Sequence, residues 1–510
     1  MRNNLFMPVF ISGLLLAGAA LPLSAGEDDF LKPVGKPPAA KAQRRQGGEA
    51  MPPLPLPATP LRRSEKKRPP SPTALIGKVV WGSYIDFTWE NGLVSRIFDW
   101  NMVPADCQQL LRIVKNYMKL EYKVQTVDLA TFNGSPSEIP ILYFSGGRSL
   151  KFTNEERGKL RQYLLDGGMI WFDSIVGSPY FYRSALEEIH KILPEAPIKR
   201  LEPDHPVFHM LIAVNNAKTN TGQIIEPAMD GVYIGSRLAA VISPYGMGCG
   251  WDNAEPSLIP DAKIYQKRTA LEIGVNLTAY SIGWFENDMA YAAGEAYSDK
   301  DKTASTDKIV FAQVKTGGIW NSDPGAESKF MRYLAKNVNI DAGTMPVYID
   351  PASMPLDDYP FLYLSGIGAF KISRQEIEHL RAYMDKGGFL LLNNSLGLNE
   401  FDNSVRQICG VLYPDRQLER IPDNDPVFSK GPFKLAQSGF SDAAATKYPG
   451  CGKPLLYGIR DGERERYKLI YSPVDIAGGW TNTSRPGSVC YSPETALRLG
   501  ANLITYFMTH

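Results

Sequence analysis

Two apolar runs flank a helical pattern in the stretch from residue 141 to residue 174. Residues 141–144 are uninterruptedly apolar and end at a Ser-Gly pair, which is typical of a buried strand that meets a tight turn. A helix should begin after Thr153, because Thr-Asn-Glu-Glu is a capping box, and Gly167 should end it. A second apolar run follows at residues 169–172. Strand, helix and strand in this order predict a βαβ unit and therefore a parallel sheet with helices on both faces.

The same pattern occurs a second time without any gap. Tyr143 corresponds to Tyr363, and the residues that follow keep a constant offset of 220. The other matched pairs are Trp100 and Trp320, Thr153 and Ser373, Gly167 and Gly387, and Pro206 and Pro426. A repeat of this length far exceeds solenoid periods, so it indicates two copies of one domain. We predict two tandem α/β domains, residues 75–285 and 307–510, joined by a polar linker at residues 286–306.

The first loop distinguishes the two copies. Copy one carries an insertion at residues 84–94, between its first strand and Trp100, that copy two lacks. The insertion contains aromatic residues, and we expect it to extend the loop that follows the first strand of copy one.

The N-terminal residues predict export. Arg2 precedes an apolar stretch at residues 6–20, and Leu-Ser-Ala ends at Ala25, so residues 1–25 are typical of a cleaved signal peptide. The apolar stretch is short for a membrane span, and an uncleaved anchor is the alternative. Residues 26–74 are rich in Pro, Lys and Arg, so we expect a disordered linker. The mature chain would then be periplasmic or extracellular and would not span a membrane.

Charge and cysteine content narrow the classes of partner. The chain has 55 basic and 54 acidic residues, and this balance does not favour nucleic acid as a partner. Its five cysteines are an odd number, which leaves at least one thiol unpaired, while Cys451 and Cys490 could form a disulfide. No cysteine or histidine spacing suggests zinc, and we predict neither a metal site nor a cofactor.

Several motifs of the two copies together resemble one known family. The motifs are Leu-x-x-Tyr-Leu-x-x-Gly-Gly at 160–168, Asp173, Asp-His-Pro-Val-Phe at 204–208, Gly-Val-Tyr-x-Gly-Ser-Arg at 231–237, and Trp251. They resemble the bacterial domain-of-unknown-function family 4159. That family is similar in fold to class I glutamine amidotransferases, which are flavodoxin-like. The resemblance implies two three-layer α/β sandwiches with mostly parallel sheets, and an extracytoplasmic or membrane-associated role without an established reaction.

Neither candidate nucleophile has the sequence context of an amidotransferase. Such a nucleophile needs a sharp turn from strand to helix with glycines on both sides. Ser145 follows a strand, but the next helix begins only after Thr153, so Ser145 is better interpreted as a turn hydroxyl. Cys249 lies between two glycines in a Gly-rich loop without an obvious helix behind it. We therefore predict no catalytic residue.

A ligand site, if present, should lie in copy one. Asp173 directly follows a buried parallel strand, and open α/β sheets bind ligands at that edge. His205, Arg237 and the Ser145 hydroxyl could join it, and such a site would suit a small polar ligand with hydroxyls or a carboxylate. Structural roles for Asp173 as a cap and for His205 as a hydrogen-bonded imidazole are the alternatives. Copy two has other residues, Asn393 among them, at the matching positions.

Three classes of function remain open. The first is a non-catalytic binding or scaffold protein of the bacterial cell envelope, which could contact another envelope protein or surface. The second is a hydrolase or amidotransferase-like enzyme that acts on cell-wall or glycan material. The third is a sensor domain for a small ligand. The lack of a nucleophile turn favours the first class over the second.

Overall fold

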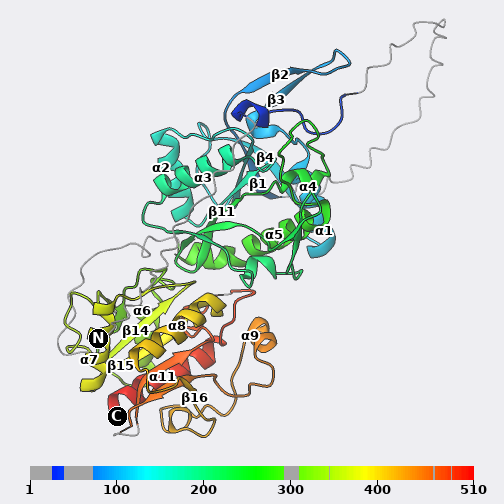
Figure 1. Cartoon of the computed structure of the whole chain (residues 1–510). Helices are drawn as coiled ribbons and strands as arrows, with labels where there is room; N and C mark the ends of the chain where they lie inside the picture. Colours follow the sequence, from blue (N-terminus) through cyan, green and yellow to red (C-terminus); the bar gives the residue numbers. More distant parts are fainter. Residues whose placement is uncertain (1–25, 39–72, 292–308, 344, 463–465, 484) are drawn as a thin grey trace, which may run out of the picture.

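A seven-stranded sheet forms the centre of the first domain (Figure 1). The computed structural model describes residues 26–38, 73–291, 309–343, 345–462, 466–483 and 485–510. In spatial order the strands are β4 (Tyr122–Asp128), β1 (Thr73–Val80), β5 (Ile141–Gly146), β6 (Met169–Ser174), β11 (Arg237–Ser243), β10 (Asp230–Ile234) and β7 (Ile198–Arg200). The first five are parallel, and β10 is antiparallel to both of its neighbours. This is the flavodoxin-like order extended by two strands.

Helices cover both faces of this sheet. One face carries α1 (Asp106–Met118), α4 (Gly248–Asp252) and α5 (Lys267–Tyr291), and the other carries α2 (Asn154–Leu165) and α3 (Pro179–Ile192). Two separate apolar cores result, one between the sheet and each helical layer. The predicted three-layer α/β architecture is therefore confirmed.

The second domain repeats the first. Its sheet contains β13 (Val347–Ile349), β12 (Ala312–Val314), β14 (Phe361–Gly366), β15 (Phe389–Asn394), β18 (Tyr467–Ser472), β17 (Tyr457–Arg460) and β16 (Glu419–Arg420), in that spatial order. Its helices are α6 (Ala326–Asn337), α10 (Ala477–Thr481) and α11 (Pro493–Thr509) on one face, and α7 (Arg374–Lys386) and α8 (Asn399–Leu412) on the other. A shorter helix, α9 (Asp442–Lys447), precedes β17.

The repeated stretch folds as its pattern predicts. Thr153 caps α2 by accepting a hydrogen bond from the backbone N–H of Glu156, whose carboxylate accepts one from the Thr153 N–H at 2.7 Å. Caps of this kind typically contribute about 1 kcal/mol. The two glycines after the helix are each required for a different reason. Gly167 has φ of +101°, and a Cβ on Gly168 would lie only 2.3 Å from the ring of Tyr163. Copy two repeats both features.

The insertion in copy one forms a β-hairpin. Its strands are β2 (Tyr84–Thr88) and β3 (Val94–Phe98), followed by a 3-10 turn, η2 (Asp99–Asn101). The hairpin projects from the first domain beside the dark blue N-terminal segment (Figure 1).

The expectation that residues 26–74 form a disordered linker is wrong for the N-terminal segment. Residues 26–38 belong to the stretch assigned to a disordered linker, yet they pack against the first domain through η1 (Glu27–Phe30). Phe30 and Leu31 are 2% and 0% exposed. Composition missed this contact because two apolar residues suffice to anchor a polar segment. The rest of that stretch up to β1, residues 39–72, lies outside the described residues, as does the predicted signal peptide.

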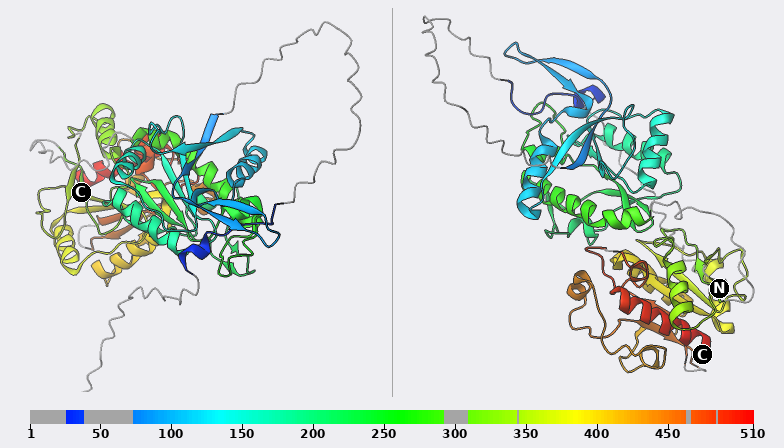
Figure 2. Two further views of the ribbon diagram at one scale, coloured as in Figure 1. Left: turned by 90° about the horizontal axis from the view of Figure 1, so that it is seen from above. Right: turned by 180° about the vertical axis from the view of Figure 1, so that it is seen from behind.

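The two domains lie end to end (Figure 2). The loops at the carboxyl ends of the strands of domain 2 contact η3 (Pro206–Phe208), the end of α5 and the β10–β11 turn of domain 1. Glu202 and Asp204 accept hydrogen bonds from the backbone N–H groups at the start of α8, at 2.9 and 3.1 Å. Carboxylates favour this position because the amino end of a helix carries partial positive charge.

The disulfide that Cys451 and Cys490 could form is absent, and all five thiols are free. Among the described residues, no helix has both the length and the apolar character needed to cross a membrane.

Candidate binding crevices at the carboxyl ends of the strands

The N-terminal segment fills the carboxyl-end crevice of domain 1. The apolar side chains that receive Phe30 and Leu31 come from the loops after β1, β6 and β11, and they include Met102, Val103, Ile175, Val176, Ile259 and Ile264. Gly147, directly after β5, allows the closest approach, because a Cβ there would lie 2.1 Å from the carbonyl oxygen of Phe30. The usual ligand-binding edge of this fold is thus occupied by the chain itself.

Polar contacts hold the same segment on both sides of its apolar anchor. The Glu27 carboxylate accepts a hydrogen bond from the backbone N–H of Ser149 at 2.6 Å, and Arg148 pairs with Asp28 at 3.2 Å. Further along, the N–H of Gly35 donates to the Glu255 carbonyl at 3.1 Å. The segment is therefore bound as a peptide along its length.

Asp173 is a saturated structural carboxylate. It is fully buried and accepts hydrogen bonds from the Tyr143 hydroxyl at 2.8 Å and from the backbone N–H groups of Met247 and Gly248 at 2.8 and 2.7 Å. Burial raises the pKa of Asp173 to about 6, against the opposing effect of these donors. The carboxylate ties the end of β6 to the start of α4, which matches its alternative interpretation as a cap.

The other predicted site residues do not gather around Asp173. Arg237 begins β11, six residues before Ser243, which pairs with Asp173, so roughly 20 Å of strand separate the two positions. The buried guanidinium of Arg237 instead donates to the carbonyl oxygens of Leu164 and Gly168 at the end of α2. The expected cluster is therefore not formed around Arg237.

His205 and Ser145 make local contacts. The Nδ1 atom of His205 accepts from the Val207 N–H at 3.1 Å and caps η3, while its ring packs against Tyr233 and Tyr280. Burial lowers the pKa of His205 to about 3, so the ring is neutral. The Ser145 hydroxyl donates to the Trp100 carbonyl at 3.2 Å, as expected of a turn hydroxyl.

Cys249 is a buried thiol in a short helix. The structure places it in α4, so a helix does follow the loop, contrary to the interpretation of the sequence. Burial, reinforced by the negative charge of Asp173, raises the pKa of Cys249 well above its ordinary value. The thiol belongs to the apolar cluster that contains Phe30 and Leu31, and its raised pKa means that it is not activated as a thiolate.

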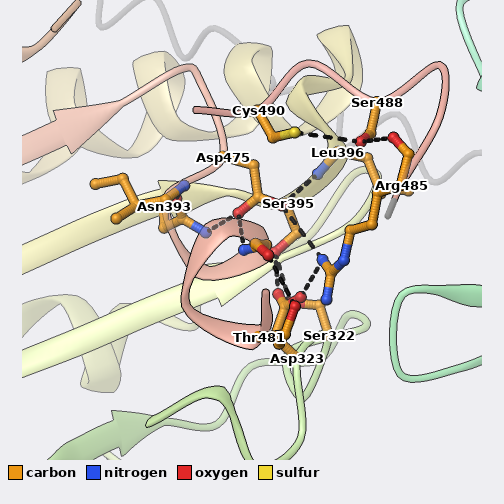
Figure 3. A network of polar contacts seen from close by, with 12 residues as sticks. Ser322, Asp323, Asn393, Ser395, Leu396, Asp475, Thr481, Arg485, Ser488 and Cys490 are labelled. Atoms are coloured by element: carbon orange, nitrogen blue, oxygen red, sulfur yellow. Dashed lines mark hydrogen bonds and ion pairs between the residues drawn. The ribbon is translucent and has the colours of Figure 1, made fainter. Parts of the chain in front are cut away.

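The matching crevice of domain 2 has a polar lining. Asp323 follows β12, Asn393 is the penultimate residue of β15, and Asp475 follows β18, and all three are buried (Figure 3). The guanidinium of Arg485 enters between the two carboxylates. It pairs closely with Asp323 and lies 3.5 Å from Asp475. Burial raises the pKa of Asp475 to about 6, with the Asp323 charge as the next cause.

Serine hydroxyls complete this polar cluster. Ser322, Ser365 and Ser395 contact one another at 2.6 to 3.2 Å, and Ser395 also donates to Asp323 at 2.9 Å. The Asn393 side chain donates to Asp475 at 2.9 Å and accepts from the Ile476 N–H at 2.8 Å. Domain 1 packs against the loops at the same edge of the domain 2 sheet. Both the Arg485 side chain and the neighbouring domain therefore close this crevice.

Comparison with known proteins places the chain in a family. The sequence model described as domain of unknown function (DUF4159) matches residues 93–282 and again residues 310–508. The chain belongs to the DUF4159 family. A search of curated proteins found no relative that matches it. The predicted resemblance and its two tandem copies are thus confirmed.

The carboxyl-end crevices of the two DUF4159 domains have opposite linings, apolar in the first domain and polar in the second. At matched positions, Met102, Val103 and Ile175 of the first are replaced by Ser322, Asp323 and Ser395 in the second. The apolar lining occurs in the domain that holds the N-terminal segment, and the polar lining occurs in the domain that holds Arg485.

Sequence reasoning missed the residues that fill the crevices. Phe30 and Leu31 lie in a stretch whose composition predicts disorder, and Arg485 lies in the loop before α11, where no local pattern marks its partner. Comparison of the two DUF4159 copies could have found the lining, because the constant offset pairs Val103 with Asp323.

Two pockets adjoin the crevice edges of the first DUF4159 domain. One, of about 380 Å³, lies along the loop between α4 and α5 and is lined by residues such as Asn220, Asn253 and Lys267. The other, of about 430 Å³, lies at the domain junction and includes Tyr182, Arg200 and Glu400. Within the described part of the chain, no group of His, Cys, Asp or Glu side chains could hold a metal ion.

Proposed function

We propose that the chain is an exported binding or scaffold protein of the bacterial cell envelope that acts through its surfaces. One observation carries this proposal: both carboxyl-end crevices are filled by the chain's own side chains, Phe30 and Leu31 in domain 1 and Arg485 in domain 2. An enzyme of this fold would keep that edge open for substrate. The export component rests on the signal-like sequence at residues 1–25.

The state of the candidate reactive groups supports the same proposal. The Cys249 thiol is buried with a raised pKa, and the Asp173 carboxylate already accepts three hydrogen bonds. Neither group is poised to attack or to exchange a proton with a substrate.

The β2–β3 hairpin is the surface to test first for partner contact. It occurs in domain 1 alone, and it presents Tyr84 and Val94, which are 48% and 61% exposed. Arg96 stabilises the Tyr84 ring from above, with 4.0 Å between the guanidinium carbon and the ring centroid. An ordered aromatic flanked by charge is a common feature of contact surfaces.

Photocrosslinking in the native envelope tests the proposal. A photoreactive residue is placed at Val94 and, as a matched control, at Val411, which is 52% exposed on α8. We expect ultraviolet-dependent adducts with envelope components from Val94 and few from Val411. Equal adduct formation at the two sites, or hydrolysis of cell-wall fragments that is lost in Cys249→Ala, would overturn the proposal.

A further inference from the structure

The contact between residues 27–38 and domain 1 has the composition of a peptide-recognition site. Its amino-terminal part is polar, where the Ser149 N–H and Arg148 bind the carboxylates of Glu27 and Asp28. An apolar socket for an aromatic and an aliphatic side chain follows. The Gly147 backbone approaches the Phe30 carbonyl too closely for any larger residue. The contacts select two consecutive acidic residues, Glu27 and Asp28, and, after one intervening residue, an aromatic and an aliphatic residue, Phe30 and Leu31.

The apolar lining of this socket occurs in domain 1, which binds residues 27–38, and not in domain 2. In domain 2 the matched residues are polar and meet Arg485, so the fold itself does not require an apolar lining. Ile175 and Val103 instead belong to the apolar cluster that contains Phe30 and Leu31. The carboxyl-end crevice of domain 1, called the groove below, and residues 27–38 are therefore complementary to each other.

The segment is joined to domain 1 only through residues 39–72, so its docking is equivalent to intramolecular peptide binding. A peptide joined to its binding site by a short flexible linker typically has an effective concentration near 1 mM, and we take this value for the estimate. With an intrinsic Kd of roughly 10 µM, the groove would be free about 1% of the time, and a competing peptide would bind about 100-fold more weakly than to an empty groove.

We propose that this groove docks a partner polypeptide in which consecutive carboxylates precede an aromatic–aliphatic pair, and that residues 27–38 form a tethered plug that competes with it. The inference rests on the proposed binding function and names the class of its partner. Arg148 and the Ser149 N–H bind the partner's carboxylates, and the socket binds the pair that follows them.

Peptide binding to the full mature chain tests the proposal. The double variant Phe30→Ala, Leu31→Ala weakens the plug, and a fluorescent peptide of residues 26–38 is added in trans. Fluorescence anisotropy should show binding to the variant about 100-fold tighter than to the wild-type chain. The same peptide with alanine in place of its Phe and Leu should not bind. Equal affinity for both chains, or no binding to the variant, would overturn the proposal.

Gly147 offers a variant that blocks the groove without disturbing the domain. The three atoms that an added Cβ would meet all belong to Phe30. Gly147→Ala in the plug-weakened chain should therefore abolish peptide binding while thermal unfolding stays unchanged. Gly158→Ala is the matched control, because nothing lies within 4 Å of its added Cβ, and it should keep full binding. Retained binding in the Gly147→Ala chain would contradict the assigned groove.

The outcome is separable from that of the proposed function. If Val94 crosslinks to envelope components but the peptide does not bind, the groove proposal falls alone. If the peptide binds as predicted but Val94 and Val411 give equal adducts, the envelope function falls and the groove stands.

Discussion

Replacing Arg485 with methionine should strongly destabilise domain 2. The substitution keeps much of the side-chain volume but removes the cation between Asp323 and Asp475, which are 1% and 0% exposed. Loss of one partner from a buried ion pair costs about 3–5 kcal/mol, because the remaining charges lie unpaired in a poorly solvated interior. With a typical urea dependence of about 2 kcal/mol per molar, the midpoint of domain 2 should fall by roughly 2 M.

The cost should depend on pH in a defined direction. The pKa of Asp475 in the folded chain is about 6, above its unfolded value, so protonation favours the folded state. Stability linked to this group is fully present below the unfolded pKa and is lost as pH rises through the folded one. The Arg485 charge lowers the pKa of Asp475, so its removal raises this pKa further and lets the folded variant take up a proton at higher pH. The Arg485→Met penalty should therefore be largest near pH 8 and smaller by about 1–2 kcal/mol near pH 5.

Urea denaturation should be followed by hydrogen exchange of the β15 and β18 amides, which report on domain 2 alone. The control is Arg374→Met, which removes an exposed ion pair with Glu378 at 2.8 Å and should change the free energy of unfolding little, because water screens exposed ion pairs. Adding Asp323→Asn to Arg485→Met should recover at least about 1.5 kcal/mol, because one unpaired charge is removed. A penalty equal to that of Arg374→Met, or one independent of pH, would show that Arg485 does not neutralise two buried carboxylates.

Three further substitutions or probes test other parts of the structure. Glu327 is fully buried, its carboxylate oxygens have no hydrogen-bond partner among the described residues, and burial raises its pKa to about 8. Glu327→Gln should therefore raise the melting temperature at pH 9 and change it little at pH 5, as scanning calorimetry can check. Gly168→Ala should cost about 2 kcal/mol or more in chemical denaturation, because its Cβ would meet the Tyr163 ring. In the folded chain a thiol reagent should modify Cys451 quickly, whereas Cys249 should react only after unfolding.

The repeat explains why the fold could be predicted. Capping boxes at Thr153 and Ser373 and the glycine pairs that end the helices are local signals, and each depends on residues close in sequence. Two copies in one register then reinforced each assignment. The parallel sheet followed, since strand–helix–strand units of this length close in that way.

The site could not be predicted in the same way, because its contacts are distant in sequence. Asp173 was placed correctly at the end of a strand, but its three donors come from Tyr143 and from the loop after β11. Arg237 carried a motif, yet its place at the start of β11 puts it at the opposite edge of the sheet. Arg485 contacts Asp323 across more than 160 residues, and no spacing rule reports such a pair.

The contacts of a helical glycine also could not be predicted from the sequence. Gly274 lies inside α5, where glycine costs about 1 kcal/mol relative to alanine. An added Cβ would lie 2.7 Å from both Leu110 and Trp251, so the close approach of helix and neighbours requires glycine. A glycine inside a helix indicates a close contact with a neighbouring element, and only the structure identifies the side chains involved.

Hydrogen exchange of residues 27–35 in the full chain tests directly whether the chain's own N-terminal segment fills the crevice of domain 1. The N–H groups of Leu31 and Gly35 donate to the carbonyls of Asp28 and Glu255, both at 3.1 Å. If the groove is free about 1% of the time, exchange should be slowed about 100-fold, an opening free energy of about 2.7 kcal/mol. The double variant Phe30→Ala, Leu31→Ala should lose this protection. Exchange of residues 27–35 in the wild-type chain as fast as in an unstructured peptide would contradict the account.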